Sequence, residues 1–305
     1  CRIHRRGRTG PHLRALLGRT MANILDGKET ARIIREQLRQ RCYELKEKGF
    51  VPGLAVVLVG DDPASSIYVR QKEKACIEVG FSSFRYGLPA SATEPELLGL
   101  IDRLNQDNRV HGILVQLPLP GGLSAERVIG RIFPGKDVDG FHPVNVGLLS
   151  CGLPGVVPCT PKGVLRILRE YDIPLEGKRA VVVGRSNIVG KPVANLLLGA
   201  NMTVTVCHSR TPDLARETLQ ADVVVAAAGK PGIIGASMVK EGAVVVDVGI
   251  HRTPEGIVGD VKFCEVAEKA SWITPVPGGV GPLTIAMLME NTMELAERTR
   301  GEGNQ

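Results

Sequence analysis

Near its middle the chain reads Ala180-Val181-Val182-Val183-Gly184-Arg185-Ser186-Asn187-Ile188-Val189-Gly190-Lys191-Pro192. The apolar start predicts a buried strand, and the two glycines bound a turn that opens a helix. This order is typical of a phosphate-binding loop, because backbone N–H groups at a helix N-terminus attract anions. The match to Gly-x-Gly-x-x-Gly is incomplete, since Ser186 replaces the second glycine and Gly190 follows Gly184 by six positions. An ordinary strand–helix turn is the alternative.

The segments around this stretch continue the alternation of strands and helices. We expect strands at 179–184, 203–207, 222–228, 243–249 and 272–274, and helices at 190–199, 212–219 and 236–240. The continuous valine and alanine runs suit strands that are buried on both faces of a parallel sheet. Residues 158–281 are therefore expected to form an α/β domain with a doubly wound, Rossmann-like parallel sheet.

A second set of alternating segments precedes this domain. We expect helices at 26–48, 64–79, 93–105 and 124–132, and strands at 54–59, 84–88 and 112–117. Gly49 and Gly80 suit helix ends, and Thr93 with Glu96 forms a capping box. The pattern predicts another α/β domain, over residues 21–157.

A loop-rich stretch, residues 133–160, carries the boundary between the two domains. After it, Thr160 as the N-cap and Pro161 at the first helical position predict a helix that runs to Tyr171.

The formal net charge of +6 does not extend over the fold. Residues 1–20 contain six Arg and no acidic residue, whereas from Met21 onward basic and acidic residues balance at 32 each. We expect residues 1–20 to be a non-native or unstructured extension: translated upstream sequence, a tag or a targeting peptide, although the absence of Ser argues against targeting. A nucleic-acid-binding role would therefore rest on this extension. The low aromatic content, 4% of the residues, also argues against surfaces on which nucleic-acid bases stack.

The seven cysteines are scattered and never spaced as Cys-x-x-Cys. This usage predicts reduced thiols and a cytoplasmic location, and neither the cysteines nor the histidines have the spacing of a metal site. No apolar run approaches the roughly 18 residues that a membrane helix needs. We therefore expect no metal, no membrane and no nucleic acid among the partners.

The residues that follow the expected strand at 203–207 indicate which nucleotide the domain binds. An NAD-binding fold usually places an acidic residue near this point to hold the ribose hydroxyls. Here His208-Ser209-Arg210 follows the strand, and Arg185 lies on the neighbouring turn. Two cationic side chains and a hydroxyl suit a 2′-phosphate, so the sequence favours NADP over NAD. A solvated polar loop is the alternative.

Tyr68 and Lys72 stand four residues apart in an expected helix. This spacing places the phenol and the ammonium on one helix face. Short-chain dehydrogenases use a Tyr-x-x-x-Lys pair, but theirs follows the dinucleotide turn within one domain, whereas this pair lies more than a hundred residues upstream. A surface pair is the alternative.

Three further stretches are candidates for ligand contacts. Gln116 ends a buried strand, which is where parallel sheets place ligand groups. Asp137 and Asp139 lack the remaining ligands of a calcium loop, and Asp139 suits the N–H donors of an aminopyrimidine-type ring. The stretch from Pro275 to Pro282 is rich in proline and glycine, so its backbone can lie flat against a ligand.

Together these motifs resemble the bifunctional methylenetetrahydrofolate dehydrogenase/methenyltetrahydrofolate cyclohydrolase family over residues 22–300. The motifs are Tyr68-x-x-x-Lys72, Val115-Gln116-Leu117-Pro118, Lys136-Asp137-Val138-Asp139-Gly140, Pro158-Cys159-Thr160-Pro161, the stretch from Val183 to Pro192, and Pro275 to Pro282. They occur in the family's order and approximate spacing.

The resemblance implies two α/β domains with a cleft between them, a C-terminal helix at 282–300 that packs back on the first domain, and a homodimer. It implies oxidation of 5,10-methylenetetrahydrofolate by NADP⁺ and hydrolysis of the product to 10-formyltetrahydrofolate, in one-carbon metabolism and purine biosynthesis. A monofunctional dehydrogenase or cyclohydrolase would share these motifs. A silent NADP-binding regulator is expected to lose Lys72 or Asp139, and both are present.

The resemblance also implies roles for individual residues. Lys72 is the expected general acid/base, Gln116 holds its amine, Tyr68 contacts the pterin and Asp139 anchors the N–H groups of the pterin. Further substrate contacts are expected from Val115, Leu117, Pro277, Gly278, Gly279, Val280 and Gly281. NADP contacts are expected from Gly184, Arg185, Ser186, Ser209, Arg210 and Ile250.

Overall fold

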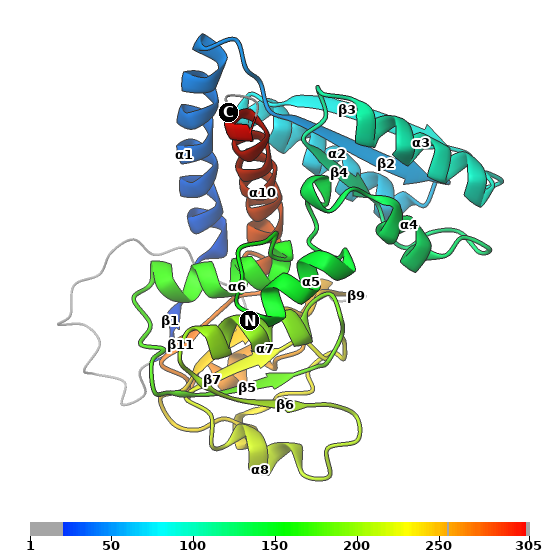
Figure 1. Ribbon diagram of the computed structural model, residues 1–305. Coiled ribbons are helices and arrows are strands. Elements are labelled where there is room, and N and C mark those ends of the chain that lie inside the picture. Colours follow the sequence, from blue (N-terminus) through cyan, green and yellow to red (C-terminus); the bar gives the residue numbers. More distant parts are fainter. Residues whose placement is uncertain (1–20, 255, 303–305) are drawn as a thin grey trace. The chain divides into compact units, whose positions relative to one another are not determined.

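The computed structural model describes residues 21–254 and 256–302 (Figure 1). The extension predicted for residues 1–20 lies outside the described residues. Among the described residues, contacts divide the chain into two compact units. We call residues 28–166 with 282–302 the N-terminal unit, and residues 21–27 with 167–281 the C-terminal unit. Both are α/β, as the sequence predicts.

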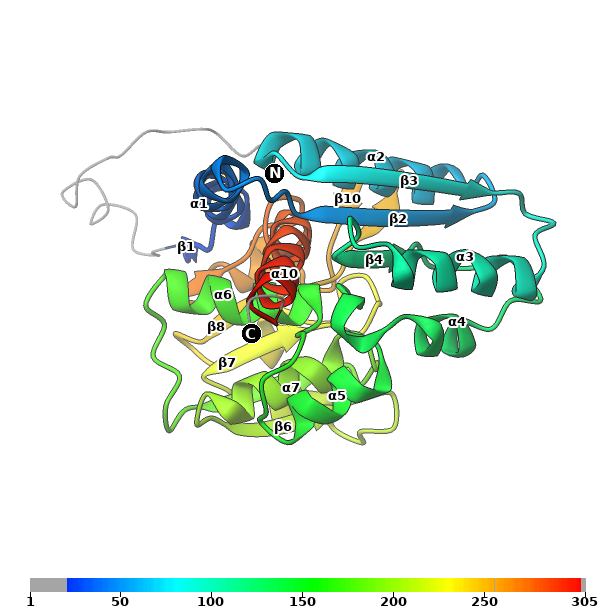
Figure 2. The ribbon, with the colours of Figure 1, turned by 45° about the horizontal axis from the view of Figure 1, so that its top comes forward.

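The N-terminal unit is built on a parallel sheet in the order β3-β2-β4. Its strands are β2 (Gly53–Val59), β3 (Ser82–Leu88) and β4 (Gly112–Val115). Every residue of the central strand β2 is buried, which requires cover on both faces of the sheet. Figure 2 shows this cover: α2 (Pro63–Val79) lies on one side, and α3 (Glu94–Gln106) with α4 (Ala125–Arg131) lies on the other.

Local signals explain where the helices of this unit begin and end. The Asp62 carboxylate accepts a bond from the Ser65 amide at 2.7 Å and starts α2, and Gly80 ends it in the left-handed region with φ 87°. The predicted capping box of α3 is confirmed, with the Thr93 amide donating to Glu96 at 2.7 Å. A cap of this kind stabilises a helix by about 1 kcal/mol.

Two long helices complete the N-terminal unit and lie side by side in Figures 1 and 2: α1 (Gly27–Glu47) and α10 (Val280–Glu302). Arg41 of α1 and Glu297 of α10 form an ion pair at 2.6 Å. The helix α10 begins at Val280, so the predicted loop residues Val280 and Gly281 lie in its first turn. None of the described helices has the length and apolar content needed to cross a membrane.

The start of α6 (Cys159–Glu170) differs from the prediction. The Lys162 amide donates to the Pro158 carbonyl at 2.9 Å, so Thr160 is inside the first turn and is not the N-cap. Pro161 is tolerated there because the first-turn N–H groups have no intrahelical partner in any case. The sequence also missed α5 (Pro143–Ser150), which lies in the stretch predicted to be loop.

The C-terminal unit contains a parallel sheet whose order among the described residues is β1-β11-β8-β7-β5-β6. Its strands are β1 (Asn23–Ile24), β5 (Arg179–Val183), β6 (Thr203–Cys207), β7 (Val223–Ala226), β8 (Val244–Asp247) and β11 (Trp272–Ile273). The chain leaves β5 for β6 on one side and returns to β7 on the other. This reversal of direction at β5 is the switch point of a doubly wound sheet, where such folds bind their ligands.

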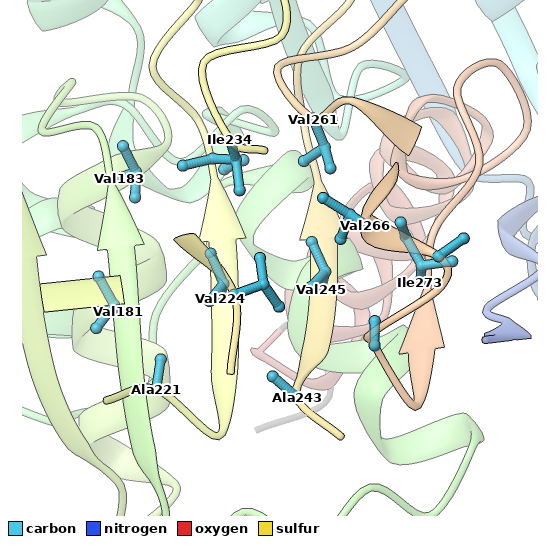
Figure 3. Packing of buried hydrophobic residues seen from close by; sticks show 14 of the residues in the cluster. Val181, Val183, Ala221, Val224, Ile234, Ala243, Val245, Val261, Val266 and Ile273 are labelled. Atoms are coloured by element: carbon cyan, nitrogen blue, oxygen red, sulfur yellow. The ribbon is translucent and has the colours of Figure 1, made fainter. Parts of the chain in front are cut away.

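Alternate residues of these strands form one apolar layer. Figure 3 shows Val181, Val183, Val224 and Val245 of three neighbouring strands on the same face. Each fully buried valine contributes roughly 1.5–3 kcal/mol through burial. Strands buried on both faces need apolar residues at every position, so their continuous valine runs predict this sheet from the sequence.

Among the remaining elements of the C-terminal unit, the sequence analysis predicted the longer helices and missed the shortest segments. Helices α7 (Gly190–Gly199) and α8 (Leu214–Thr218) were expected. The helix predicted at 236–240 is a short 3₁₀ turn, Ala236–Met238. The strand β1, the hairpin of β9 (His251–Thr253) and β10 (Gly256–Val258), and the helix α9 (Phe263–Val266) were not predicted. Elements of two to four residues are too short to show a period.

Candidate active site

The lysine that the sequence singled out is bonded to the predicted glutamine. Lys72 lies on α2 one helical turn after Tyr68, and its Nζ donates to Gln116 Oε1 at 2.8 Å. Gln116 follows the buried strand β4, with its amide bonded to the Val57 carbonyl at 2.9 Å. Its side-chain Nε2 donates to the Leu117 carbonyl at 2.7 Å, which turns Oε1 toward the lysine. The end of β4 therefore sets the direction of the Lys72 amine.

Burial and charge tune the groups around this amine. Desolvation lowers the pKa of Lys72, and the negative charge of Asp139 opposes that shift. Desolvation raises the pKa of Asp139 to about 6, against the opposite effect of Lys72 and with a smaller contribution from Asp137. Burial also raises the pKa of the Cys159 thiol. The mutual influence shows that Lys72, Asp139 and Cys159 share one poorly solvated region of the N-terminal unit.

The loop that carries Asp139 is held by side chains from two helices. The buried Asp137 accepts bonds from the His142 amide at 2.8 Å and from the Asn145 side chain at 2.9 Å. Asn291 of α10 donates to the Val138 carbonyl at 2.9 Å. The sequence analysis assigned no role to either asparagine. Asn291 had one available signal, since it stands one helical turn from both Met287 and Leu295, on an apolar helix face.

The other residues predicted for the substrate differ in accessibility. The side chain of Tyr68 is 40% exposed, on the helix face that it shares with Lys72. Val115 is buried in the core between the sheet and α3, so only its backbone is available to a ligand. Leu117, one residue beyond Gln116, is partly exposed. Together with Gln116 and Asp139, these residues belong to the N-terminal unit.

The predicted phosphate turn lies at the switch point of the C-terminal unit. Gly184 follows β5, has φ 132° and donates its amide to the Cys207 carbonyl at 2.8 Å. A Cβ at this position would stand 2.0 Å from the Ala227 carbonyl oxygen, so the turn after β5 packs directly on the turn after β7. Ser186 Oγ accepts bonds from the Val189 and Gly190 amides at 3.2 and 3.3 Å. Ser186 thus bonds two amides at the start of α7, a role that the sequence analysis did not foresee.

The residues predicted to select NADP lie at one edge of this sheet. Val183 and Cys207 are paired in the β5–β6 ladder, so the turns that follow them start side by side. Arg185 lies on one turn and Arg210 on the other, and both are exposed, as is Ser209. The second turn is fixed by a bond from the Arg210 amide to His208 Nδ1 at 3.1 Å. Two guanidinium groups and a hydroxyl are therefore available at the carboxyl edge of β5 and β6.

The proline- and glycine-rich stretch up to Gly281 belongs to the C-terminal unit, together with Ile250. Ile250 is 48% exposed, and its Cδ1 atom lies 3.4 Å from where a Cβ of Gly281 would stand. Packing accounts for one glycine of the stretch, since a Cβ on Gly279 would lie 2.6 Å from the Pro275 carbonyl oxygen. Pro277 and Gly278 precede it in the same turn. The predicted cleft depends on the placement of the two units and stays a prediction.

Family models match both parts of the chain. Residues 25–139 match the catalytic domain of tetrahydrofolate dehydrogenase/cyclohydrolase, and residues 158–300 match the NAD(P)-binding domain of the same family. Among curated proteins, the bifunctional protein FolD of Moorella thermoacetica is 58% identical over 91% of this chain and 99% of its own length. Bifunctional protein FolD 2 of Geobacter metallireducens is 55% identical over 93% of this chain and 100% of its own length.

Solved structures give the same result. The bifunctional FolD methylenetetrahydrofolate dehydrogenase/cyclohydrolase of Campylobacter jejuni superposes with a TM-score of 0.90 at 54% identity, over 91% of this chain and 99% of that one. The Trypanosoma brucei enzyme, complexed with NADP cofactor and inhibitor, has a TM-score of 0.88 at 41% identity, over 92% of this chain and 99% of that one. The geometry and these similarities agree: the chain belongs to the tetrahydrofolate dehydrogenase/cyclohydrolase family.

Proposed function

We propose that the chain is a bifunctional enzyme of one-carbon metabolism. It oxidises 5,10-methylenetetrahydrofolate to the methenyl cation with NADP⁺ and hydrolyses that cation to 10-formyltetrahydrofolate. The observation that carries the proposal is the poorly solvated Lys72 amine, held at 2.8 Å by Gln116 and influenced by Asp139. The bifunctional relatives, which align over more than nine-tenths of the chain, support both activities.

Lys72 acts as the acid and base of the hydrolysis. Its lowered pKa raises the fraction of neutral amine near neutral pH. That amine accepts a proton from the water that attacks the methenyl carbon. The resulting ammonium then returns a proton to the ring nitrogen as the carbon–nitrogen bond breaks. The hydroxyl of the intermediate loses its remaining proton to solvent as the formyl C=O bond forms. The Gln116 oxygen accepts a bond from the lysine in either protonation state, so it holds Nζ throughout.

Asp139 and Tyr68 bind the pterin. At neutral pH Asp139 is largely ionised, since its pKa is about 6. A carboxylate accepts two N–H bonds side by side, which matches the amino group and ring N–H of a pterin. The phenol of Tyr68 lies on the same helix face as Lys72 and is partly exposed, so it can contact the ring. The backbone at Leu117, next to Gln116, is a further proposed contact with the ring. The contacts expected from the 277–281 stretch stay a prediction.

The C-terminal unit has the groups that NADP requires. The Gly184 turn lies at the switch point, and Arg185, Ser209 and Arg210 present two positive charges and a hydroxyl that suit a 2′-phosphate. Bound NADP⁺ supplies the hydride acceptor. We therefore propose that residues 158–281 bind NADP, and that residues 21–157 with the helix at 282–300 bind folate.

The assembly and cellular setting are also proposals. The family resemblance implies a homodimer. The edge strand β6, which carries the exposed Val206, is available for such an interface. All six cysteines that the structure describes are free thiols, which fits a cytoplasmic enzyme. The 10-formyl product supports a role in purine biosynthesis. Light scattering coupled to gel filtration tests the dimer, and a monomer at micromolar concentration would contradict it.

Two spectrophotometric assays on the purified chain test the function. One follows NADPH formation from methylenetetrahydrofolate, and the other follows the loss of methenyltetrahydrofolate without cofactor. We expect activity in both. Activity in the first assay alone would identify a monofunctional dehydrogenase, and activity in the second alone a monofunctional cyclohydrolase.

A further inference from the structure

Two buried carboxylates in the C-terminal unit have no part in the proposed chemistry. Asp247 ends β8 and is 3% exposed, and Asp260, beyond the β9–β10 hairpin, is fully buried. A buried carboxylate is costly unless hydrogen bonds compensate for its lost hydration. The bonds of these two residues therefore show what the fold gains from keeping them.

Asp247 ties its own strand to the segment after the hairpin. Its Oδ1 accepts bonds from the Gly249 and Asp260 amides, both at 2.9 Å, and its Oδ2 accepts one from the Val261 amide at 2.9 Å. Gly259 lies directly against this carboxylate, since a Cβ there would stand 1.9 Å from Oδ2. The segment that carries Asp260 is thus fixed by Asp247.

Asp260 extends the network to the turn after β7. Its Oδ2 accepts bonds from the Ala228 amide at 2.6 Å and the Gly229 amide at 2.9 Å. Its Oδ1 lies 2.7 Å from Nε2 of His251, the first residue of the hairpin. With Asp260 ionised, Nε2 bears the proton of this bond. His251 retains 20% exposure, so it links the buried carboxylate to the surface of the unit.

The turn after β7 is one wall of the proposed cofactor site. Val183 and Ala226 are paired in the β5–β7 ladder, and these two strands border the switch point. The Ala227 carbonyl contacts Gly184, so a shift of residues 227–229 would move the phosphate turn. His251 also directly follows Ile250, another residue proposed to contact NADP.

We propose that His251 is a positioning residue for the cofactor. Through Asp260 it holds the Ala228–Gly229 turn against the Gly184 turn, and it sets the position of Ile250 next to it. The inference rests on the proposed NADP site. No catalytic contact is assigned to His251.

The test compares three variants of the full chain. His251→Leu removes the N–H donor at similar volume, and His251→Gln retains an N–H donor at about the same reach. Arg252→Leu changes the exposed neighbour in the same strand and is the matched control. For each we measure the Kd of NADP⁺ by calorimetry, KM and kcat of the dehydrogenase, the cofactor-free hydrolysis rate and Tm.

We expect His251→Leu to raise both Kd and KM for NADP⁺ about tenfold, because Oδ1 of the buried Asp260 loses its partner and the carboxylate shifts, with the two amides bonded to it, to regain one. Dehydrogenase kcat should fall less than KM rises. His251→Gln should restore NADP⁺ binding to within about threefold of wild type, since its amide restores the missing bond. Arg252→Leu should match wild type, and hydrolysis should be unchanged in all three variants.

Two results would overturn the inference. One is a lower Tm for His251→Leu with an unchanged Kd for NADP⁺, which would make His251 purely structural. The other is an equal loss of hydrolysis, which would indicate general damage to the fold. If the wild-type chain itself fails to bind NADP⁺, the proposed function fails first, and that result is recognised without any variant.

Discussion

The two units prepare their functional groups in opposite ways. In the N-terminal unit the proposed catalytic groups, Lys72 and Asp139, are partly buried side chains, and desolvation shifts their pKa values toward neutrality. In the C-terminal unit Arg185 and Arg210 are exposed, and the fold instead fixes the backbone turns that carry them. Proton transfer requires a perturbed pKa, whereas binding a charged cofactor requires well-placed charges and amides.

The largest expected effect concerns the partly buried side chains of the N-terminal unit. Lys72→Met should reduce hydrolysis of methenyltetrahydrofolate by roughly 10²–10⁴-fold, because no other group replaces the amine as acid and base. Binding of NADP⁺ should be unchanged. The measurement is the absorbance decay of the methenyl substrate, with NADP⁺ calorimetry in parallel.

Lys74→Met is the control, since Lys74 is exposed on the same helix. It should retain wild-type hydrolysis. Unchanged hydrolysis in Lys72→Met would contradict the proposed role of that amine as acid and base.

In the C-terminal unit, where the backbone turns are fixed, a single added methyl group is expected to have a large effect on stability or on NADP⁺ binding. Gly184→Ala places a methyl group 2.0 Å from the Ala227 carbonyl, at a φ of 132° that L-residues avoid. The variant should lose roughly 3 kcal/mol of unfolding free energy, or shift the turn and lose NADP⁺ binding. Urea unfolding and calorimetry distinguish these two outcomes.

Gly199→Ala is the matched control for this change. Gly199 ends α7, and an added Cβ would meet nothing within 4 Å. Its effect on stability should stay within about 1 kcal/mol. If both alanine variants behave alike, the close approach at Gly184 is unimportant.

Arg185→Ala separates the contribution of an exposed charge from that of the backbone turn, because it removes the guanidinium and leaves the turn unchanged. The KM for NADP⁺ should rise roughly 10–100-fold, which corresponds to one lost charge-assisted contact, and the KM for NAD⁺ should change by less than about threefold. Lys178→Ala removes an exposed charge at the amino end of β5 and should change neither. Equal effects of Arg185→Ala on both cofactors would remove the argument for a bound 2′-phosphate.

The smallest expected effect concerns the pH dependence of stability. Because burial raises the pKa of Asp139 to about 6, the folded chain binds a proton there more tightly than the unfolded chain. Protonation should therefore stabilise the fold as pH falls from about 6 toward the ordinary value near ~3.9, and ionisation should destabilise it above pH 6. Asp139→Asn should accordingly be more stable than wild type at pH 7, with the difference shrinking by pH 5.

Urea unfolding at the two pH values measures this difference directly. Subtracting the wild type removes the contribution of Asp247, whose pKa is also raised to about 6 and which is present in both proteins. A difference that stays constant between pH 7 and pH 5 would show that Asp139 titrates as it does in the unfolded chain.

Much of the architecture was readable because the signals are local. The valine runs of β5, β7 and β8 predicted a sheet buried on both faces, and the Thr93–Glu96 box predicted the start of α3 within one residue. The spacing of Tyr68 and Lys72 predicted their shared helix face. Local signals can also mislead. Thr160 precedes a proline and has the side chain of an N-cap, but it lies inside the first turn of α6.

Sequence alone determined the two alternating patterns, the helix that carries Lys72 and the balance of charges that favours NADP. The patterns and the helix depend on residues close together in the chain, and the charges depend on two turns that follow neighbouring strands of one sheet. The contacts of Asn291 with the Asp139 loop and of Asp260 with the turn beside Gly184 came from the tertiary structure alone. The structure also contains the bond between Gln116 and Lys72, 44 positions apart, which only the family resemblance had implied. Such contacts arise when distant segments are packed around a common core, and their partners leave no mark on the local pattern of the chain.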